Sequence, residues 1–338
     1  MSDFKKIRKQ FLCAVPLNQI NLIDLLKDVS AKNQEQLIKD TVDDELVLKR
    51  PIAINYQKAF VKEVMNIFEK QNSVIDDSVY EAYGRLVALP SENLYFKHYL
   101  NDFGDIVSLM ENVNLISDGT TGLRTWQAAV AFSEWSLQNC NDFADQSVLE
   151  LGSGIGLTGL TIVNHCGPKK FYFSDCHPSV LSTLCDNVTL NLNPLEPEKK
   201  QDYRNKIEDN EVFLMQGDFV NLNSIVVPVG VLNISWEKFD EKTCKKIGNI
   251  DKVIATDIVY DSDLFEPLFH ALNTLAEYCR VKEFIFCCTE RNKETLNSFL
   301  MQLLERNFMI LHEIQVPKEQ HFVWSNETPI RIHAFMKK

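Results

Sequence analysis

A glycine-rich turn lies between two carboxylates near the middle of the chain. Residues 148–156 read Val-Leu-Glu-Leu-Gly-Ser-Gly-Ile-Gly, and residues 171–175 read Phe-Tyr-Phe-Ser-Asp. Glycines let the backbone pass close to a ligand. An acidic side chain at the end of the second strand, here Asp175, can accept hydrogen bonds from ribose hydroxyls. The pattern predicts the first βαβ unit of a nucleoside-binding fold and points to an adenosine cofactor, chiefly S-adenosylmethionine or a nicotinamide dinucleotide.

Two glycine registers overlap in this turn. Residues 154–159, Gly-Ile-Gly-Leu-Thr-Gly, match the dinucleotide pattern, whereas residues 150–156 match the pattern of an acidic residue followed by three alternating glycines. In the dinucleotide fold, the glycines turn a strand directly into a helix whose N-terminus receives pyrophosphate. The last apolar residue of the strand is Leu151, so the turn begins at Gly152. This favours the second register, in which S-adenosylmethionine contacts Glu150 and the glycine loop.

A third acidic strand end follows about 100 residues later. Residues 252–261 read Lys-Val-Ile-Ala-Thr-Asp-Ile-Val-Tyr-Asp, an apolar strand that delivers Asp257 and then Tyr260. In open α/β sheets the chemistry takes place at the carboxyl ends of the strands. The Asp257 carboxylate could hold or help to deprotonate an ammonium group, and the Tyr260 ring could stabilise positive charge. An Asp that caps the following helix is the structural alternative.

Strand and helix patterns alternate from residue 147 onward, which predicts an α/β, doubly wound, Rossmann-like sheet. The last two strands are separated only by a loop, so they are expected to pair as an antiparallel hairpin at the C-terminus. The expected helices are 156–166, 178–190, 263–278 and 292–306. The seven expected strands are 147–151, 171–174, 211–215, 252–256, 283–288, 308–315 and 329–336.

The first 88 residues carry helical patterns and no glycine loop or catalytic constellation. Residues 57–70 are the clearest case, with apolar side chains at three- and four-residue spacing. We therefore expect a helical region over residues 1–88, which serves in packing or in substrate recognition. The methyltransferase-like catalytic domain is expected over residues 89–338. Residues 93–100 and 105–116, separated by an Asn-Asp-Phe-Gly turn, predict a β-hairpin.

The composition restricts the kinds of partner and the cellular compartment that are expected for this protein. The 338 residues include 35 Lys and Arg against 47 Asp and Glu, a net charge of −12, so nonspecific binding of nucleic acid or of an anionic membrane is not expected. No leader or run of about 18 apolar residues is apparent. The nine cysteines are scattered without C-x-x-C pairs, and neither they nor the histidines have metal-ligand spacing. We expect a soluble, cytoplasmic protein with no metal.

Taken together, these motifs resemble the seven-β-strand protein-lysine methyltransferases, and most closely those that act on eukaryotic elongation factor 2. The specific stretches are Thr-Thr-Gly-Leu-Arg-Thr-Trp at 120–126 and Ser-Asp-Cys-His at 174–177. The resemblance implies S-adenosylmethionine as cofactor, elongation factor 2 as protein substrate, and a D-x-x-Y motif, Asp257 to Tyr260, at the acceptor-lysine channel. It implies a cofactor pocket formed by Trp126, Gly152, Ser153, Gly154, Asp175, Trp236 and Thr256, to which the glycine pattern adds Glu150 and Gly156.

One position departs from that family. Ser235 stands before Trp236 where the family usually carries Asp, so Ser235 or Asp218 is expected to take over the contact with adenine. Three other functions remain open at this point. They are an NAD-dependent reductase, a methyltransferase of small molecules, and a cofactor-binding adaptor without activity.

Overall fold

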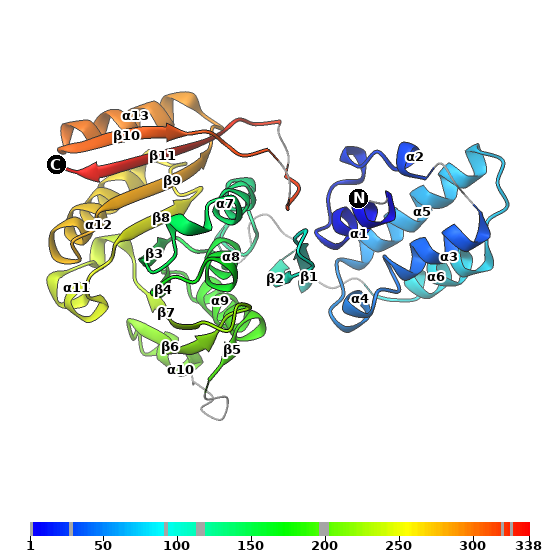
Figure 1. The fold of residues 1–338 in the computed structure, drawn as a ribbon, viewed down its shortest axis with the longest axis horizontal. Helices are drawn as coiled ribbons and strands as arrows, with labels where there is room; N and C mark the ends of the chain where they lie inside the picture. The colour runs from blue at the N-terminus through cyan, green and yellow to red at the C-terminus, as the bar shows by residue number, and fades with distance from the viewer. Residues whose placement is uncertain are drawn as a thin grey trace. The chain divides into compact units, whose positions relative to one another are not determined.

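The computed structural model describes residues 3–26, 30–90, 94–112, 119–195, 203–318, 321–324 and 327–338. The chain divides into two compact units, residues 1–115 and residues 116–338 (Figure 1). The predicted hairpin belongs to the first unit, and the glycine loop and all the acidic strand ends belong to the second. Within the described ranges, no helix is long and apolar enough to cross a membrane.

Helices make up most of the first unit, as expected for residues 1–88. The longest is α5, and it buries the apolar face that the sequence predicts, including Phe60, Val64 and Phe68. Buried apolar side chains of this kind supply most of the stability of a small helical unit. The helices are α1 (Asp3–Leu12), α2 (Leu22–Leu25), α3 (Ala31–Lys39), α4 (Glu45–Lys49), α5 (Ile54–Lys70) and α6 (Asp77–Val87).

A two-stranded antiparallel hairpin, β1 (Leu94–Leu100) and β2 (Ile106–Asn112), completes this unit. The side chain of Asn101 organises its turn, because Oδ1 accepts hydrogen bonds from the backbone N–H groups of Phe103 and Asp105, both at 2.9 Å. The hairpin prediction is confirmed. Residues 93 and 113–116, at its predicted outer ends, lie outside the described residues.

The second unit contains a nine-stranded sheet in the order β10-β11-β9-β8-β3-β4-β7-β6-β5. Its central strands run parallel, and β11 pairs antiparallel with both β9 and β10. The doubly wound sheet and its C-terminal antiparallel hairpin are therefore confirmed. The strands are β3 (Ser147–Leu151), β4 (Lys170–Asp175), β5 (Asn193–Pro194), β6 (Phe213–Val220), β7 (Val226–Asn233), β8 (Lys252–Thr256), β9 (Glu283–Thr289), β10 (Phe308–Ile314) and β11 (Ile330–Lys337).

The third strand of the sheet differs from the prediction. The strand expected over 211–215 is β6, which pairs antiparallel with the outer side of β7. The strand β7, which lies between β6 and β4, was not among the expected strands. The β7 sequence contains Pro228 and Gly230, two residues that weaken a strand pattern. Gly230 is needed there because a Cβ atom would lie 2.6 Å from the ring of Tyr172 on β4. Asp218 lies within β6 and is exposed, so it does not follow a central strand as expected.

Helices cover both faces of the sheet (Figure 1). On one face, α11, α12 and α13 pack over a large apolar cluster that includes Phe269, Phe286 and Phe299. On the other face, α7, α8 and α9 contact the central strands. These helices are α7 (Gln127–Gln138), α8 (Leu157–Cys166), α9 (Pro178–Asn191), α10 (Tyr203–Glu208), α11 (Glu241–Ile247), α12 (Phe265–Tyr278) and α13 (Lys293–Glu305). Since both faces are covered, only the strand ends are open to a ligand.

Candidate active site

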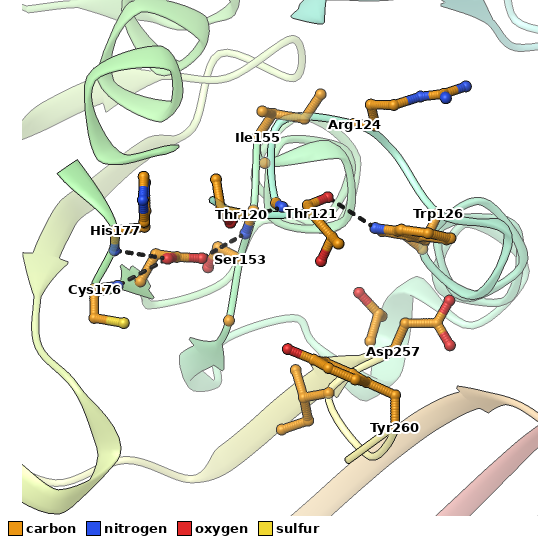
Figure 2. Close-up of a pocket in the computed structure, with 18 of the residues that line it drawn as sticks. Thr120, Thr121, Arg124, Trp126, Ser153, Ile155, Cys176, His177, Asp257 and Tyr260 are labelled. Atoms are coloured by element: carbon orange, nitrogen blue, oxygen red, sulfur yellow. Dashed lines mark hydrogen bonds between the residues drawn. The ribbon is translucent and has the colours of Figure 1, made fainter. Parts of the chain in front are cut away.

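A cavity of about 430 Å³ opens at the carboxyl ends of β3, β4 and β8. Its volume falls in the usual range for small-molecule sites, about 300–1,000 Å³. Figure 2 shows Asp257 between Trp126 and Tyr260 on one side, with Cys176 and His177 on the opposite side. The cavity brings together ten of the predicted site residues, namely Trp126, Gly152, Ser153, Gly154, Gly156, Asp175, Trp236, Thr256, Asp257 and Tyr260.

The glycine loop forms the turn between β3 and α8. Gly152, Gly154 and Gly156 have φ angles of 61°, 52° and 99°, in the left-handed region that favours glycine. A Cβ atom on Gly152 would lie 2.8 Å from the side chain of Ile258. A Cβ atom on Gly154 would lie 3.2 Å from the backbone oxygen of Gly122. The loop therefore presents bare backbone to the cavity and tolerates no side chain at these points.

Asp175 ends β4 beside this loop. Its Oδ1 accepts hydrogen bonds from the backbone N–H groups of Cys176 at 2.8 Å and His177 at 3.2 Å, and its Oδ2 accepts one from Gly154 at 3.2 Å (Figure 2). Burial raises the pKa of Asp175 above its ordinary value, while these three bonds act in the opposite direction. A carboxylate has about four acceptor positions, so one remains for a ligand hydroxyl.

Glu150 is the exception among the predicted cofactor contacts. Its side chain is buried beneath the glycine loop and does not line the cavity. Burial raises the pKa of Glu150 to about 8, so its carboxyl group is mostly protonated at neutral pH. Among the described residues, its Oε2 has no hydrogen-bond partner. The Glu150 side chain points to the sheet face that α7, α8 and α9 cover. Glu150 therefore supports the glycine loop from below.

Two tryptophans, Trp126 and Trp236, line the cavity. Trp126 is the residue before α7, and its ring N–H donates a hydrogen bond to the backbone oxygen of Thr121 at 3.1 Å. Trp236 follows β7 and lies within 3.9 Å of the Cβ position that Gly152 lacks. Ser235 also lines the cavity, whereas Asp218 does not. The alternative that Asp218 reaches adenine is therefore wrong, because β7 separates its strand from β4.

Asp257 has a backbone conformation that few non-glycine residues adopt, with a φ angle of 54°. Its N–H donates to the backbone oxygen of Cys287 at 2.8 Å. Its carboxylate accepts hydrogen bonds from the Thr289 N–H at 2.7 Å and the Thr289 hydroxyl at 2.9 Å. The Arg291 guanidinium adds two longer bonds, at 3.1 and 3.4 Å. All four acceptor positions of this carboxylate are thus used within the protein.

Tyr260 is the more open member of the D-x-x-Y motif, with 55% of its surface exposed. Its ring lies at the cavity, and its hydroxyl points away from the Asp257 carboxylate (Figure 2). Partial burial raises the pKa of Tyr260, so the phenol stays protonated at neutral pH. The aromatic face and the neutral hydroxyl are suited to a cationic or amine group.

Several lining residues were not predicted as site residues. Thr121, Arg124, Cys176 and His177 line the cavity, and all four belong to the two motif stretches that carry the family resemblance. Residues 289–292, Thr-Glu-Arg-Asn, follow the strand expected over 283–288, and from the sequence alone they could cap the next helix or line the substrate side. The cap of α13 is in fact Asn292, which accepts hydrogen bonds from the next residues of the helix.

These residues fit an adenosine cofactor without phosphates. The bare glycine backbone, the free acceptor position of Asp175 and the tryptophan rings can receive a ribose and a base. The loop turns at Gly152, as expected for the S-adenosylmethionine register. The fold and the cavity thus define a nucleoside-cofactor enzyme of the Rossmann-like class.

Comparisons with known proteins identify the family. The model of the lysine methyltransferase family matches residues 110–205 and 207–306. Protein-lysine N-methyltransferase EEF2KMT of Homo sapiens is 32% identical over 308 residues, which cover 88% of this chain and 86% of the relative. Protein-lysine N-methyltransferase EFM3 of Chaetomium thermophilum is 26% identical over 333 residues, covering 88% of this chain and 90% of the relative.

Among solved structures, the methyltransferase domain of bacterial-CtHen1-C matches with a TM-score of 0.40 and 12% identity, over 62% of this chain and 98% of that domain. The chain belongs to the lysine methyltransferase family. It is an enzyme that transfers methyl groups to lysine, and S-adenosylmethionine is its methyl donor.

Proposed function

We propose that this enzyme methylates a lysine side chain of elongation factor 2. The observation that carries the proposal is the joining, in one cavity, of the glycine loop and Asp175 with the D-x-x-Y pair, Asp257 and Tyr260. The identity of the substrate is supported by the name EEF2KMT, which three curated relatives share at 30–37% identity.

The cofactor side of the cavity is formed by the glycine loop, Asp175, Trp126, Trp236 and Thr256. When bound, S-adenosylmethionine supplies an activated methyl group, so the protein needs chiefly to align it with an amine. Asp175 would accept a hydrogen bond from a ribose hydroxyl through its one remaining acceptor position. The exposed backbone of the glycine loop would face the amino-acid portion.

The acceptor side of the cavity is formed by Asp257 and Tyr260. A free lysine has a pKa of about 10.4 and is mostly an ammonium ion at neutral pH. Desolvation beside the Tyr260 ring would lower that pKa, so that the lysine would lose its proton to water and enter as the amine. Asp257, held by Thr289 and Arg291, would fix the acceptor end of the cavity, and the ring and hydroxyl of Tyr260 would face the resulting amine. No dedicated base is required for this sequence of events.

The protein acts in the cytoplasm.

The helical region over residues 1–88 serves to recognise the substrate. Tyr80 and Val87 lie seven residues apart on α6 and are 50% and 54% exposed, so they share one open face. Replacing both with Ser is expected to raise the KM for elongation factor 2 several-fold. The affinity for S-adenosylmethionine, measured by calorimetry, is expected not to change. Equal losses in both quantities would contradict a role in recognition.

The main test is transfer of a radiolabelled methyl group into purified elongation factor 2 and, in parallel, into a eukaryotic cell extract. We expect the wild-type protein to label elongation factor 2 and Asp257→Asn to lose at least tenfold in kcat. Asn tolerates the left-handed conformation and keeps an oxygen for the Thr289 N–H, so the fold is expected to survive.

The matched control is Asp261→Asn. Asp261 belongs to the same loop but is exposed and does not line the cavity; it accepts a hydrogen bond from the Asp263 N–H at 3.0 Å. This variant is expected to keep normal activity. Label in another protein of the extract would refute the substrate, and label only in small molecules would refute the protein-directed function.

A further inference from the structure

Arg291 forms an ion pair with Asp257, the carboxylate that lines the acceptor side of the cavity. Its two terminal nitrogens lie 3.1 and 3.4 Å from the two oxygens of Asp257. Its guanidinium carbon lies 4.7 Å from the centre of the Trp126 ring, a cation–π distance. The Asp257 side chain is only 4% exposed, whereas that of Arg291 is 41% exposed. One cation therefore bridges the acceptor-side carboxylate and a wall of the cofactor side.

The backbone around Arg291 holds it in this position. Its N–H donates to the backbone oxygen of Thr289 at 2.8 Å, and the Glu290 N–H donates to that of Pro329 at 2.8 Å. The Glu290 carboxylate is engaged elsewhere, with Arg331 at 3.1 Å. Arg291 is therefore the cation that faces Asp257, and Glu290 does not compete for it.

We propose that Arg291 is a positioning residue that neutralises Asp257, so that the acceptor lysine enters a site without net negative charge and reacts as the amine. This inference rests on the proposed lysine-directed function of the cavity. An unpaired Asp257 would stabilise the ammonium form of the lysine, which has no lone pair with which to attack a methyl group. A guanidinium is protonated at every physiological pH, so the compensation does not depend on pH.

The other titratable groups around this pair do not supply the same compensation. Cys287 and Cys288 interact with Asp257, but burial raises the pKa of both thiols well above neutrality, so they remain uncharged. Tyr260 is likewise protonated at neutral pH. Among the described residues, the other Asp, Glu, Lys and Arg side chains that line the cavity are Arg124, Asp175 and Glu237, while Asp261 and Glu290 belong to the two adjoining loops.

The test is the pH dependence of kcat for methylation of elongation factor 2 by wild type, Arg291→Gln and Arg291→Lys. The pH profile of kcat reports ionisations in the enzyme–substrate complex. An opposite charge within about 4–6 Å shifts a pKa by about one unit or more. We expect Arg291→Gln to move the midpoint of the profile about one pH unit upward. Its kcat is then about tenfold lower at pH 7.5 and close to normal at pH 9.5. Arg291→Lys restores most of the wild-type profile.

Equilibrium binding provides a second readout that does not depend on turnover. With the demethylated product of the donor bound, Arg291→Gln is expected to bind elongation factor 2 several-fold more tightly than wild type, because the bare carboxylate now attracts the ammonium form. Damage to the fold would instead weaken both binding and rate. A lower kcat combined with a lower Kd is thus specific to the proposed role.

The matched control is Arg306→Gln. Arg306 pairs with Glu266, and its guanidinium lies 4.2 Å from the centre of the Phe269 ring. The Arg306→Gln variant therefore also loses an ion pair and a cation–π contact, as Arg291→Gln does. It follows the opposite end of α13 and should leave the pH profile unchanged. An Arg291→Gln profile parallel to that of wild type, with weaker binding, would overturn the proposal.

If elongation factor 2 accepts no label but another protein in the extract does, the proposed substrate is wrong, and the same series is run on the labelled protein. If no protein accepts label, both the proposed function and this inference fall.

Discussion

The buried Glu150 gives the most quantitative prediction. Its pKa rises from an ordinary value of 4.5 to about 8 because burial disfavours the carboxylate. In the unfolded chain the same group ionises near 4.5, so between these pH values the folded state binds the additional proton. Unfolding then becomes easier as pH increases through this window. Glu150 is therefore expected to weaken the fold progressively from about pH 5 to pH 8.

The full difference between a pKa of 4.5 and one of about 8 corresponds to about 5 kcal/mol, at about 1.4 kcal/mol per pKa unit. About 3 kcal/mol of this falls between pH 5 and pH 8. Glu150→Gln is uncharged at every pH and nearly the same shape, so the variant is expected to lack this part of the pH dependence. Relative to wild type, it should gain about 3 kcal/mol in unfolding free energy across that interval.

Tryptophan fluorescence during urea unfolding measures this effect selectively. All four tryptophans, at positions 126, 135, 236 and 324, belong to the unit that contains Glu150. The decisive comparison is the change in unfolding free energy between pH 5 and pH 8 in wild type and in Glu150→Gln. Any pH-independent effect of the new amide on the unfolding free energy cancels in this difference. If wild type and Glu150→Gln change in parallel from pH 5 to pH 8, the buried, protonated state of Glu150 is refuted. A large loss of S-adenosylmethionine affinity in the variant would instead show direct contact with the cofactor.

Two further predictions concern packing and a buried histidine. Gly159→Ala would place a Cβ atom 2.2 Å from the ring of Phe173, so we expect the tryptophan-detected unfolding free energy to fall by about 1–3 kcal/mol or more. Its control, Gly84→Ala in α6, meets no atom within 4 Å and should stabilise the first unit by about 0.5–1 kcal/mol, measured by circular dichroism. Burial lowers the pKa of His98 to about 4, so the first unit should lose about 3 kcal/mol as pH falls from about 6.5 to 4. His98→Gln should remove that loss in circular dichroism-monitored unfolding, and an unchanged acid transition would contradict it.

The elements that the sequence predicts best are those with local signals. The glycine loop, the acidic ends of β3 and β4, and the strand that delivers Asp257 each combine an apolar run with a sharp change of residue type. The third strand has no such signal. Pro228 and Gly230 interrupt it, although the strand buries Val227, Val229 and Val231, and Gly230 allows the close packing against Tyr172. The strand expected over 211–215 is β6, and because β7 was not foreseen between it and β4, Asp218 was considered as a contact for adenine.

The Arg291 contact could not be predicted, for a different reason. Asp257 and Arg291 are 34 residues apart, and they meet because β8 and β9 are parallel neighbours. Sequence patterns place each residue at the end of its own strand but contain no information on which side chain turns toward the other. The helix cap considered for residues 289–292 is present at Asn292, and Thr289 and Arg291 bond to Asp257, while a role of these residues toward the substrate stays a prediction.

The hydrogen bonds at Asp257 show how the sheet itself shapes the acceptor side. Beyond the last residue of β8, the Asp257 N–H still donates to Cys287 of β9, and the Thr289 N–H of β9 donates back to the Asp257 carboxylate. The strand pairing is thus continued by a side chain after the backbone of Asp257 has turned into the left-handed region. That conformation costs about 1–3 kcal/mol for a non-glycine residue, and the sheet contacts compensate for it. The carboxylate of Asp257 thus secures the strained turn through Thr289, and in the proposed mechanism it also carries the charge that Arg291 neutralises.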